Sequence, residues 1–327
     1  MNYRPTMHDV ARLAGVSIKT VSRVVNNEPR VNPETGAKVS KAIQELGFRR
    51  NEQARSLRPG QASGLLGLVT SDMSNPFYSA IACGIEEVAQ QRGYFVLTAS
   101  SEEDASREQR LIESLLQHNI DGLMIVPAVG DHQYLSPTLL RDVPAVALDR
   151  PGHAQMDSVL LDNREGALQA VTALIGEGHR RIAMIDGYPQ VYTGAERIAG
   201  YAAALRQHQI EQVPDLIMTG HHGELQAEAA MDRLFRLGDP PTAVFTTNNR
   251  ITLGVLRAMK RWNRWLAVAS FDDFELADML HIPILVVRYN AVEMGRKAAE
   301  LLFHRLEDPQ TTARTCYVPV EVVIRGG

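Results

Sequence analysis

Apolar residues near the start of the chain recur at the spacing of a short helix. Thr6 followed three residues later by Asp9 is the pattern of a capping box, which marks a helix N-terminus. The apolar positions that follow lie three or four residues apart and share one helical face: Val10, Leu13 and Ala14. The pattern therefore predicts a short amphipathic helix that begins after Thr6.

A tight turn and a second helix are expected next. Gly15 should end the first helix, and Ser17 is a favoured N-cap residue for the following one. The apolar positions of this second stretch again recur at helical spacing and should face inward: Val21, Val24 and Val25. Two short helices joined by such a turn predict a helix-turn-helix.

A third helix is expected to complete a small α-helical domain. Asn32 is a cap residue, Pro33 is well tolerated in a first turn, and Gly47 marks the end of the helix. The apolar face of this helix comprises Val39, Ile43 and Leu46. The three apolar faces together predict a three-helix core.

The outward side chains of the second helix are candidates for reading DNA. In a helix-turn-helix this helix enters the major groove, where its N-terminal residues contact base edges. Ile18 and Lys19 lie at that end, and Arg23 carries a guanidinium that can donate two hydrogen bonds to O6 and N7 of guanine. Amphipathic helix pairs also occur in proteins that never touch DNA, so spacing alone leaves a structural role open.

Charge is divided unevenly along the chain and favours the DNA-binding interpretation. The 327 residues carry 34 Lys and Arg against 38 Asp and Glu, a net charge of −4. Residues 1–60 hold 11 of these basic residues and 5 of the acidic ones, so this segment is +6 and the remainder is −10. A basic head on an acidic body is typical of a nucleic-acid-binding protein whose larger part has another task.

From Gly64 onward, short apolar runs alternate with amphipathic stretches. The runs predicted as buried strands are Leu65–Thr70, Phe95–Ala99, Leu123–Val126, Ala145–Leu148, Ile182–Ile185, Ala243–Thr246 and Leu266–Phe271. Helices are predicted near Tyr78–Arg92, Ala105–His118, Glu196–His208, Gln226–Leu237 and Ile251–Lys260, with a shorter link near Tyr134–Leu140. Such alternation predicts two similar lobes, each a parallel sheet covered on both faces. A ligand is expected in the cleft between them, beyond the carboxyl ends of the strands.

Several classes of protein are disfavoured by the sequence. The motifs GxGxxG after the first strand, GxxxxGK[ST], GxSxG and HExxH are absent, so neither an enzyme nor a cofactor is predicted. There is no apolar run of about 18 residues and no signal peptide, which predicts a cytoplasmic protein that does not enter a membrane. Cys83 and Cys316 are too few for a disulfide framework or a metal site, and both are expected to be small buried hydrophobic residues.

Residues 6–57, TMHDVARLAGVSIKTVSRVVNNEPRVNPETGAKVSKAIQELGFRRNEQARSL, resemble the headpiece of the lactose-repressor and galactose-repressor family. The resemblance implies a hinge helix at Asn51–Leu57 that forms when two subunits meet on the operator, with Leu57 wedged into the minor groove. An apolar wedge between base steps costs unstacking energy and bends the duplex. Arg58-Pro59 departs from the small residues usual in the family and should end the hinge. The expected DNA contacts are Thr6, Ser17, Ile18, Lys19, Thr20, Ser22, Arg23, Asn26, Asn51, Ala54 and Leu57.

The resemblance extends over the body, in segments that include DMSNPFYSAI, VPAVALDR, GAERIAGY, PTAVFTTNN and SFDD. It implies the fold of periplasmic sugar-binding proteins, with three chain crossings between the lobes. The side chains that it assigns to effector binding are Phe77, Asp149, Arg150, Arg197, Asn248 and Asp272. Arg, Asn and Asp supply the planar donors and acceptors that a polyol needs, and an aromatic ring can stack on the apolar face of a sugar.

The expected organisation is an N-terminal all-α helix-turn-helix headpiece followed by an α/β two-lobed, periplasmic-binding-protein-like effector domain. The headpiece is placed at residues 1–50, a hinge helix and linker at 51–62, and the effector and dimerisation domain at 63–327. The first lobe is placed at about 63–162 and 291–318, and the second at about 163–290 and 319–327.

Structural roles remain open for several of these residues. Phe77 could belong to the core, Arg197 and Asp272 could pair with each other in an empty cleft, and His221-His222 fits a solvated loop better than an aromatic ligand contact. The body departs from the family at RWNRW, at LVVRYN, and at Arg250, where an uncharged residue is frequent. Extra arginines near a cleft favour a sugar acid or sugar phosphate, although a neutral sugar stays the preferred ligand.

The two parts together predict a transcription regulator, and we expect it to be a repressor. Its partners would be a pseudo-palindromic operator in double-stranded DNA, a small sugar-like effector, and a second copy of itself in a homodimer. Closure of the lobes would change the spacing of the headpieces, and induction is the expected sign of the coupling. The alternative is a sugar-binding protein of the same body fold that does not act on DNA, for which residues 1–60 would have no purpose.

Overall fold

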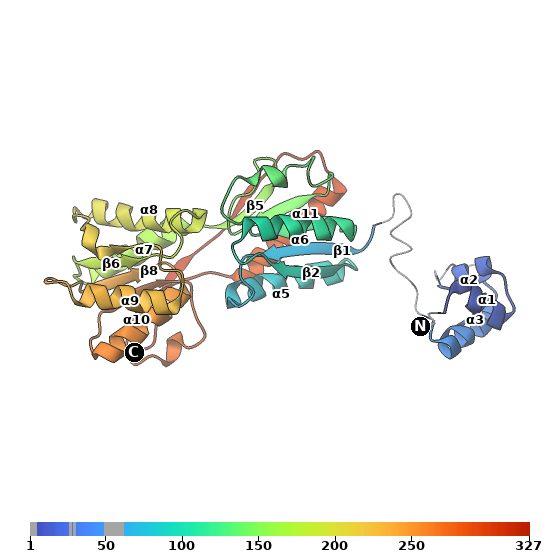
Figure 1. Ribbon diagram of the computed structural model, residues 1–327, viewed down its shortest axis with the longest axis horizontal. Coiled ribbons are helices and arrows are strands. Elements are labelled where there is room, and N and C mark those ends of the chain that lie inside the picture. Colours follow the sequence, from blue (N-terminus) through green and yellow to red (C-terminus); the bar gives the residue numbers. More distant parts are fainter. Residues whose placement is uncertain (1–4, 26–27, 29–30, 49–61) are drawn as a thin grey trace. The chain divides into compact units, whose positions relative to one another are not determined.

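The computed structural model describes residues 5–25, 28, 31–48 and 62–327. It divides into two compact units, and the boundary between them in the sequence lies between Ser63 and Gly64 (Figure 1). No helix in the described ranges is long and apolar enough to cross a bilayer.

In the described part of the first unit, three helices form a bundle: α1 (Met7–Ala14), α2 (Ile18–Val25) and α3 (Pro33–Leu46). Thr6 N donates to Asp9 Oδ2 at 2.9 Å, which closes the predicted capping box, and Gly15 ends α1 in the left-handed region at φ 66°. The buried core comprises Val10, Ala11, Val21, Val39 and Ala42. The prediction that Leu13 lies on the inward face was wrong, because Leu13 is 50% exposed and Ala11 faces the core in its place.

The first lobe of residues 64–327 is a parallel six-stranded sheet in the order β11-β5-β4-β3-β1-β2. Its strands are β1 (Leu65–Thr70), β2 (Phe95–Ser100), β3 (Gly122–Ile125), β4 (Ala145–Leu148), β5 (Asp157–Leu161) and β11 (Thr315–Val318). Helices α5 (Pro76–Gln91) and α11 (Ala291–Glu307) cover one face, and α6 (Ala105–Gln117) with the 3-10 turn η1 (His132–Leu135) covers the other. Successive strand residues point to opposite faces, so both faces are apolar.

The second lobe repeats this arrangement with the sheet order β12-β10-β9-β8-β6-β7. Its strands are β6 (Ile182–Ile185), β7 (Ile217–Met218), β8 (Ala243–Thr246), β9 (Ala267–Phe271), β10 (Ile284–Arg288) and β12 (Glu321–Arg325), of which β12 runs antiparallel to β10. Helices α7 (Asn163–Gly176) and α8 (Tyr192–Gln207) cover one face, and α9 (Glu224–Phe235) and α10 (Asn249–Trp262) cover the other. Two short 3-10 turns complete the lobe, η2 (Pro214–Leu216) and η3 (Ala277–Met279).

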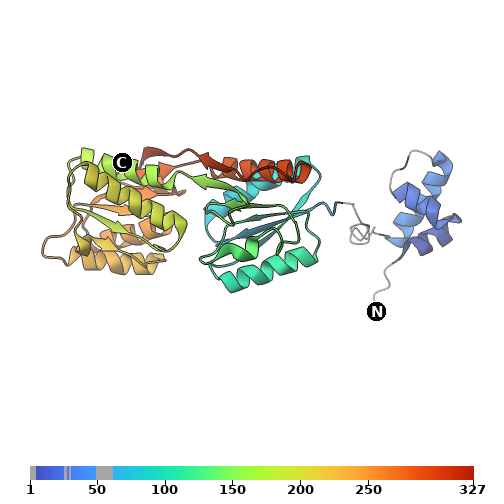
Figure 2. The same ribbon diagram turned by 90° about the horizontal axis from the view of Figure 1, so that it is seen from above.

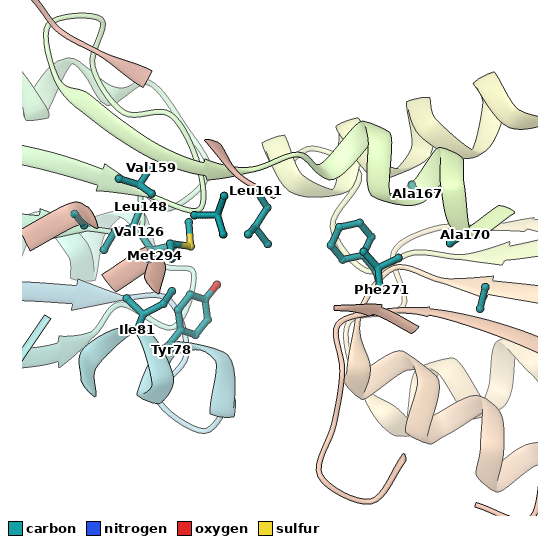
Figure 3. Packing of buried hydrophobic residues seen from close by; sticks show 14 of the residues in the cluster. Tyr78, Ile81, Val126, Leu148, Val159, Leu161, Ala167, Ala170, Phe271 and Met294 are labelled. Carbon is teal, nitrogen blue, oxygen red and sulfur yellow. The ribbon is translucent and has the colours of Figure 1, made fainter. Parts of the chain in front are cut away.

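The chain passes between the lobes three times, from β5 to α7, from β10 to α11 and from β11 to β12 (Figures 1 and 2). Figure 3 shows Leu161, at the end of β5, on the side of the first-lobe core that faces Phe271 of the second lobe. The strands therefore bring the loops at their carboxyl ends toward the space between the lobes, where a ligand site is expected.

Two expectations fail at the surface of the first lobe. Strand β2 is an edge strand rather than a buried one, and Phe95 is 76% exposed. The two cysteines are not buried either: Cys83 is exposed on α5, and Cys316 on β11 is partly exposed. An apolar run does not reveal whether a strand lies in the middle or at the edge of a sheet, because that order depends on the partners that pair with it.

Helices α5 and α11 approach each other closely through two glycines. A Cβ atom on Gly84 of α5 would collide with the backbone carbonyl of Val292, and one on Gly295 of α11 would collide with that of Ile81. Because the obstacles are backbone atoms, neither side chain could be accommodated by a change of rotamer. The two helices must therefore separate if either glycine gains a methyl group.

Gly84→Ala is expected to lower the free energy of unfolding by about 1–3 kcal/mol, the range typical of overpacking. The matched control is Gly176→Ala at the end of α7, because a Cβ there meets nothing within 4 Å. Urea unfolding of the two variants measures the difference. Equal stability of both would show that α5 and α11 are not held at this distance.

Candidate functional site

A cavity of about 140 Å³ lies between the lobes at the carboxyl ends of the parallel strands. The structure brings together in its wall all six side chains predicted to bind an effector, namely Phe77, Asp149, Arg150, Arg197, Asn248 and Asp272. The remaining lining residues are Ser71, Asp72, Asn75, Tyr78, Glu103, Tyr188, Thr193, His222 and Arg250. Every lining side chain except Phe77 carries a polar group, which suits a ligand rich in hydrogen-bonding groups.

Asp149 and Arg150 follow β4 and form part of the first-lobe wall. Asp149 adopts φ 63°, the left-handed region that Asp tolerates better than most residues, and this turns the chain away from the sheet edge. Arg150 is buried and makes a two-pronged ion pair with Glu103, at 2.7 and 2.6 Å, while Nη1 also donates to the carbonyl of Pro127. The guanidinium of Arg150 is thus already held by the protein.

The carboxylate of Asp149 is buried but incompletely paired. Oδ2 accepts a long hydrogen bond of 3.5 Å from the Tyr78 hydroxyl, and Oδ1 has no hydrogen-bond partner among residues 62–327. Burial raises the pKa of Asp149 above its ordinary value, because loss of hydration outweighs the attraction of Arg150 and Arg197. An acceptor in this state is suited to a hydroxyl group supplied by a ligand.

Asp149→Asn is therefore expected to stabilise the protein in the absence of ligand. The pKa of this carboxyl is higher in the folded chain than in the unfolded chain, so folded protein binds more protons between the two values. The stability that the Asp149 carboxyl contributes is lost as pH rises from its unfolded-state pKa through its folded-state pKa. Asn does not titrate, so the variant keeps its stability over this range. In thermal unfolding from pH 4 to pH 8, the melting temperature of the variant should increase relative to that of the wild type as pH rises. Asp215→Asn, at an exposed position, is the control. A difference that stays constant with pH would contradict the assignment.

Arg197 and Asp272 form the second-lobe wall. Arg197 lies on α8, and its Nη2 is 3.7 Å from Oδ1 of Asp272, which follows β9 at φ 70°. Nε of Arg197 donates to Asn163 at 2.9 Å, Nη1 donates to the carbonyl of Thr247 at 2.5 Å, and the guanidinium lies 3.7 Å from the centre of the Phe271 ring. The residue thus has structural partners on several elements and also borders the cavity.

Phe77 and Asn248 likewise combine a place in the cavity wall with a local structural role. Phe77 is partly buried and packs edge-on against Tyr289 at 5.5 Å, while the Tyr289 hydroxyl donates to Asp272 at 2.6 Å. Asn248 is the N-cap of α10, with Oδ1 accepting from the backbone N–H of Ile251 at 2.9 Å. Capping occupies the oxygen of the Asn248 amide and leaves its N–H groups for the cavity.

Nine lining residues were not predicted as ligand contacts, among them Glu103, Tyr188 and His222. Glu103 lies in the loop between β2 and α6, and no motif marks it. Tyr188 stacks on His222, with ring centres 4.0 Å apart, and His222 is an exposed loop residue, as expected, that also borders the cavity. The position of Tyr188 shortly after β6 was a usable signal, because loops at the carboxyl ends of parallel strands converge on one site.

The second candidate site is the exposed face of α2 in the first unit. Ile18 is 39% exposed and Lys19 is exposed. Nε of Arg23 lies 3.7 Å from Oε2 of Glu28, in an ion pair that is about half exposed on both sides. Thr20 forms hydrogen bonds with Ser17 at the N-terminus of α2. The Thr6 hydroxyl donates a hydrogen bond to Asp9 at the N-terminus of α1. Ser22 lies on α2 and is partly exposed, and the remaining predicted DNA contacts, Asn26, Asn51, Ala54 and Leu57, lie outside the described residues.

Comparison with known proteins matches both parts of the chain. The model of the lacI family of bacterial regulatory proteins matches residues 6–51, and that of the periplasmic binding protein-like domain matches residues 171–327. The ribose operon repressor of Escherichia coli K12 is 33% identical, over 93% of this chain and 94% of the repressor.

Two solved structures extend the likeness over nearly all of the chain. The cellobiose complex of the transcriptional regulator CelR is 31% identical, with a TM-score of 0.72, covering 99% of this chain and 100% of that one. The lac repressor dimer bound to operator and the anti-inducer ONPF is 25% identical, with a TM-score of 0.87, covering 98% of both chains. The chain therefore belongs to the lacI family of bacterial regulatory proteins and is a DNA-binding transcription regulator.

Proposed function

We propose that this regulator is a repressor whose operator affinity is controlled by a neutral sugar held in the interlobe cavity. The observation that carries the proposal is the composition of the cavity wall, where polar side chains from both lobes surround one small volume. A volume of about 140 Å³ is below the ~300–1,000 Å³ of pockets for drug-sized ligands, so a compact ligand is expected.

The charges of the wall favour a neutral ligand over an anionic one. The wall carries four carboxylates, Asp72, Glu103, Asp149 and Asp272, and three guanidiniums, Arg150, Arg197 and Arg250. Each guanidinium lies beside a carboxylate of the wall. A phosphate or sugar acid would have to displace one of these carboxylates, whereas the hydroxyls of a sugar can bond to both kinds of group without separating them.

Operator control follows from the position of the cavity between two lobes. A ligand that contacts both lobes stabilises the arrangement of the lobes that it fits. Where that arrangement binds operator with a different affinity, ligand and operator change each other's affinity by the same factor. We infer that the ligand weakens operator binding. The outward residues of α2, with Arg23 foremost, would read each half of a pseudo-palindromic operator in a homodimer.

A ligand panel tests the proposal. The full chain is melted with D-ribose, D-galactose, D-glucose, D-fructose, D-glucuronate, fructose 1-phosphate and hypoxanthine, because a compound that binds the native state raises the melting temperature by mass action. We expect a neutral sugar to raise it, and the same sugar to weaken binding to an operator selected from a random DNA library, measured at fixed salt. Stabilisation by the phosphorylated sugar, the sugar acid or the purine alone would overturn the proposal.

A further inference from the structure

A second hollow lies beside the ligand cavity and shares part of its wall. This groove has a volume of about 560 Å³, and three side chains line both spaces: Phe77, Arg250 and Asp272. We infer that Arg250 is a specificity-determining residue that closes the cavity toward this groove and restricts the ligand to an unsubstituted monosaccharide. The inference rests on the proposed function of the cavity as a sugar site.

Arg250 spans from the second lobe to the first. It lies in the first turn of α10, and its Nη2 donates to Ser74 Oγ at 2.5 Å while Nη1 is 3.7 Å from Asp72 Oδ2. Ser74 and Asp72 belong to the loop after β1, so these contacts hold the side chain across the opening between the two spaces. The Arg250 side chain remains 41% exposed, as expected of a side chain at an opening.

The other two shared residues are held by buried packing and cannot move aside so easily. Phe77 packs between Tyr78, at 4.9 Å, and Tyr289, at 5.5 Å between ring centres. Asp272 is 6% exposed and is bound by the Tyr289 hydroxyl and by Arg197. Of the three side chains shared by the cavity and the groove, Arg250 is therefore the one whose removal would join the two spaces with the least disturbance.

The groove beyond Arg250 has the chemistry of a site for an apolar substituent. Its floor is formed largely by apolar groups, namely Pro76, Phe77, Ala80, Leu253, Phe274, Leu276 and Ala291. Arg325 pairs within the groove with Asp273 at 2.8 Å and with Asp278 at 3.6 Å. The occupant that fits is the phenyl ring of an aryl glycoside whose sugar ring sits in the cavity, and in the wild type Arg250 stands in the way of that ring.

Calorimetric titration of the full chain tests this assignment with three ligand pairs: D-ribose, D-galactose and D-glucose, each with its phenyl glycoside. We expect the wild type to bind one free sugar and to discriminate against the matching glycoside. Arg250→Ala should narrow the ratio of the two dissociation constants by about 10-fold or more, the effect of opening a pocket to an apolar group. The matched control, Arg261→Ala, removes an exposed arginine of the same helix; neither Arg261 nor its partners Glu228 and Asp232 line either space.

A second variant, Ser74→Ala, keeps Arg250 but removes the hydroxyl that accepts a hydrogen bond from its Nη2. It tests whether the position of Arg250 separates the cavity from the groove. It should narrow the ratio less than Arg250→Ala does. A ratio unchanged in both variants, or an equal weakening of sugar and glycoside in Arg250→Ala, would overturn the inference while leaving the sugar site in place. Failure of every free sugar to bind the wild type would overturn the proposed function, and this inference with it.

Discussion

Arg197→Ala is expected to remove ligand binding and to lower the free energy of unfolding by about 3–5 kcal/mol, the range for a buried ion pair that loses one partner. Asp272 would keep the Tyr289 hydroxyl but lose its guanidinium, and it is 6% exposed. Asn163 and the Thr247 carbonyl would lose their donors at the same time. Urea unfolding measures the stability, and calorimetry with the sugar found in the panel measures binding.

Two further variants separate the structural part of this effect from the part that concerns the ligand. Arg197→Lys keeps a positive charge near Asp272 but cannot reproduce the fork of donors, so it should recover part of the stability and little of the ligand affinity. Arg164→Ala breaks an exposed pair with Glu196 and should change stability by no more than about 1 kcal/mol. Wild-type ligand affinity in both Arg197 variants would move the ligand site elsewhere.

Arg23→Ala is expected to weaken operator binding by about 1–3 kcal/mol per half-site and to relax the preference for one guanine. The fold should tolerate the change, because the contact of Arg23 with Glu28 is long and half exposed. Binding is measured by fluorescence anisotropy at fixed salt, against the selected operator and against versions in which each guanine is replaced in turn.

The matched control for Arg23 is Lys38→Ala on α3, which removes an exposed positive charge paired with Glu34. That variant should leave the base preference unchanged. If Arg23→Ala weakens binding to all sequences equally, and reduces the salt dependence by about one phosphate contact, Arg23 touches the DNA backbone and does not read a base.

Local signals were sufficient for many of the helices and strands. The capping box at Thr6 and Asp9, the N-cap at Asn32 and the left-handed Gly15 act over three or four residues, so their outcome hardly depends on the rest of the fold. The bounds of β1, β4, β6 and β8 coincide with the apolar runs for the same reason. Strands β5, β7, β10, β11 and β12 were not predicted, and pairing with their neighbours identifies them.

The sequence alone determined the alternation of strands and helices, the family, and which segments end in polar side chains at the cleft. It could not determine which of these side chains are free to meet a ligand. Extra arginines raised the chance of an anionic ligand beside the preferred neutral sugar, but their carboxylate partners could not be predicted: Glu103 lies against Arg150 and Asp72 beside Arg250, 47 and 178 residues away. Such pairings, like the stacking of Tyr188 on His222, arise where sheet order and chain crossings bring distant loops together. The charge that a ligand meets depends on those distances, and only the tertiary structure decides them.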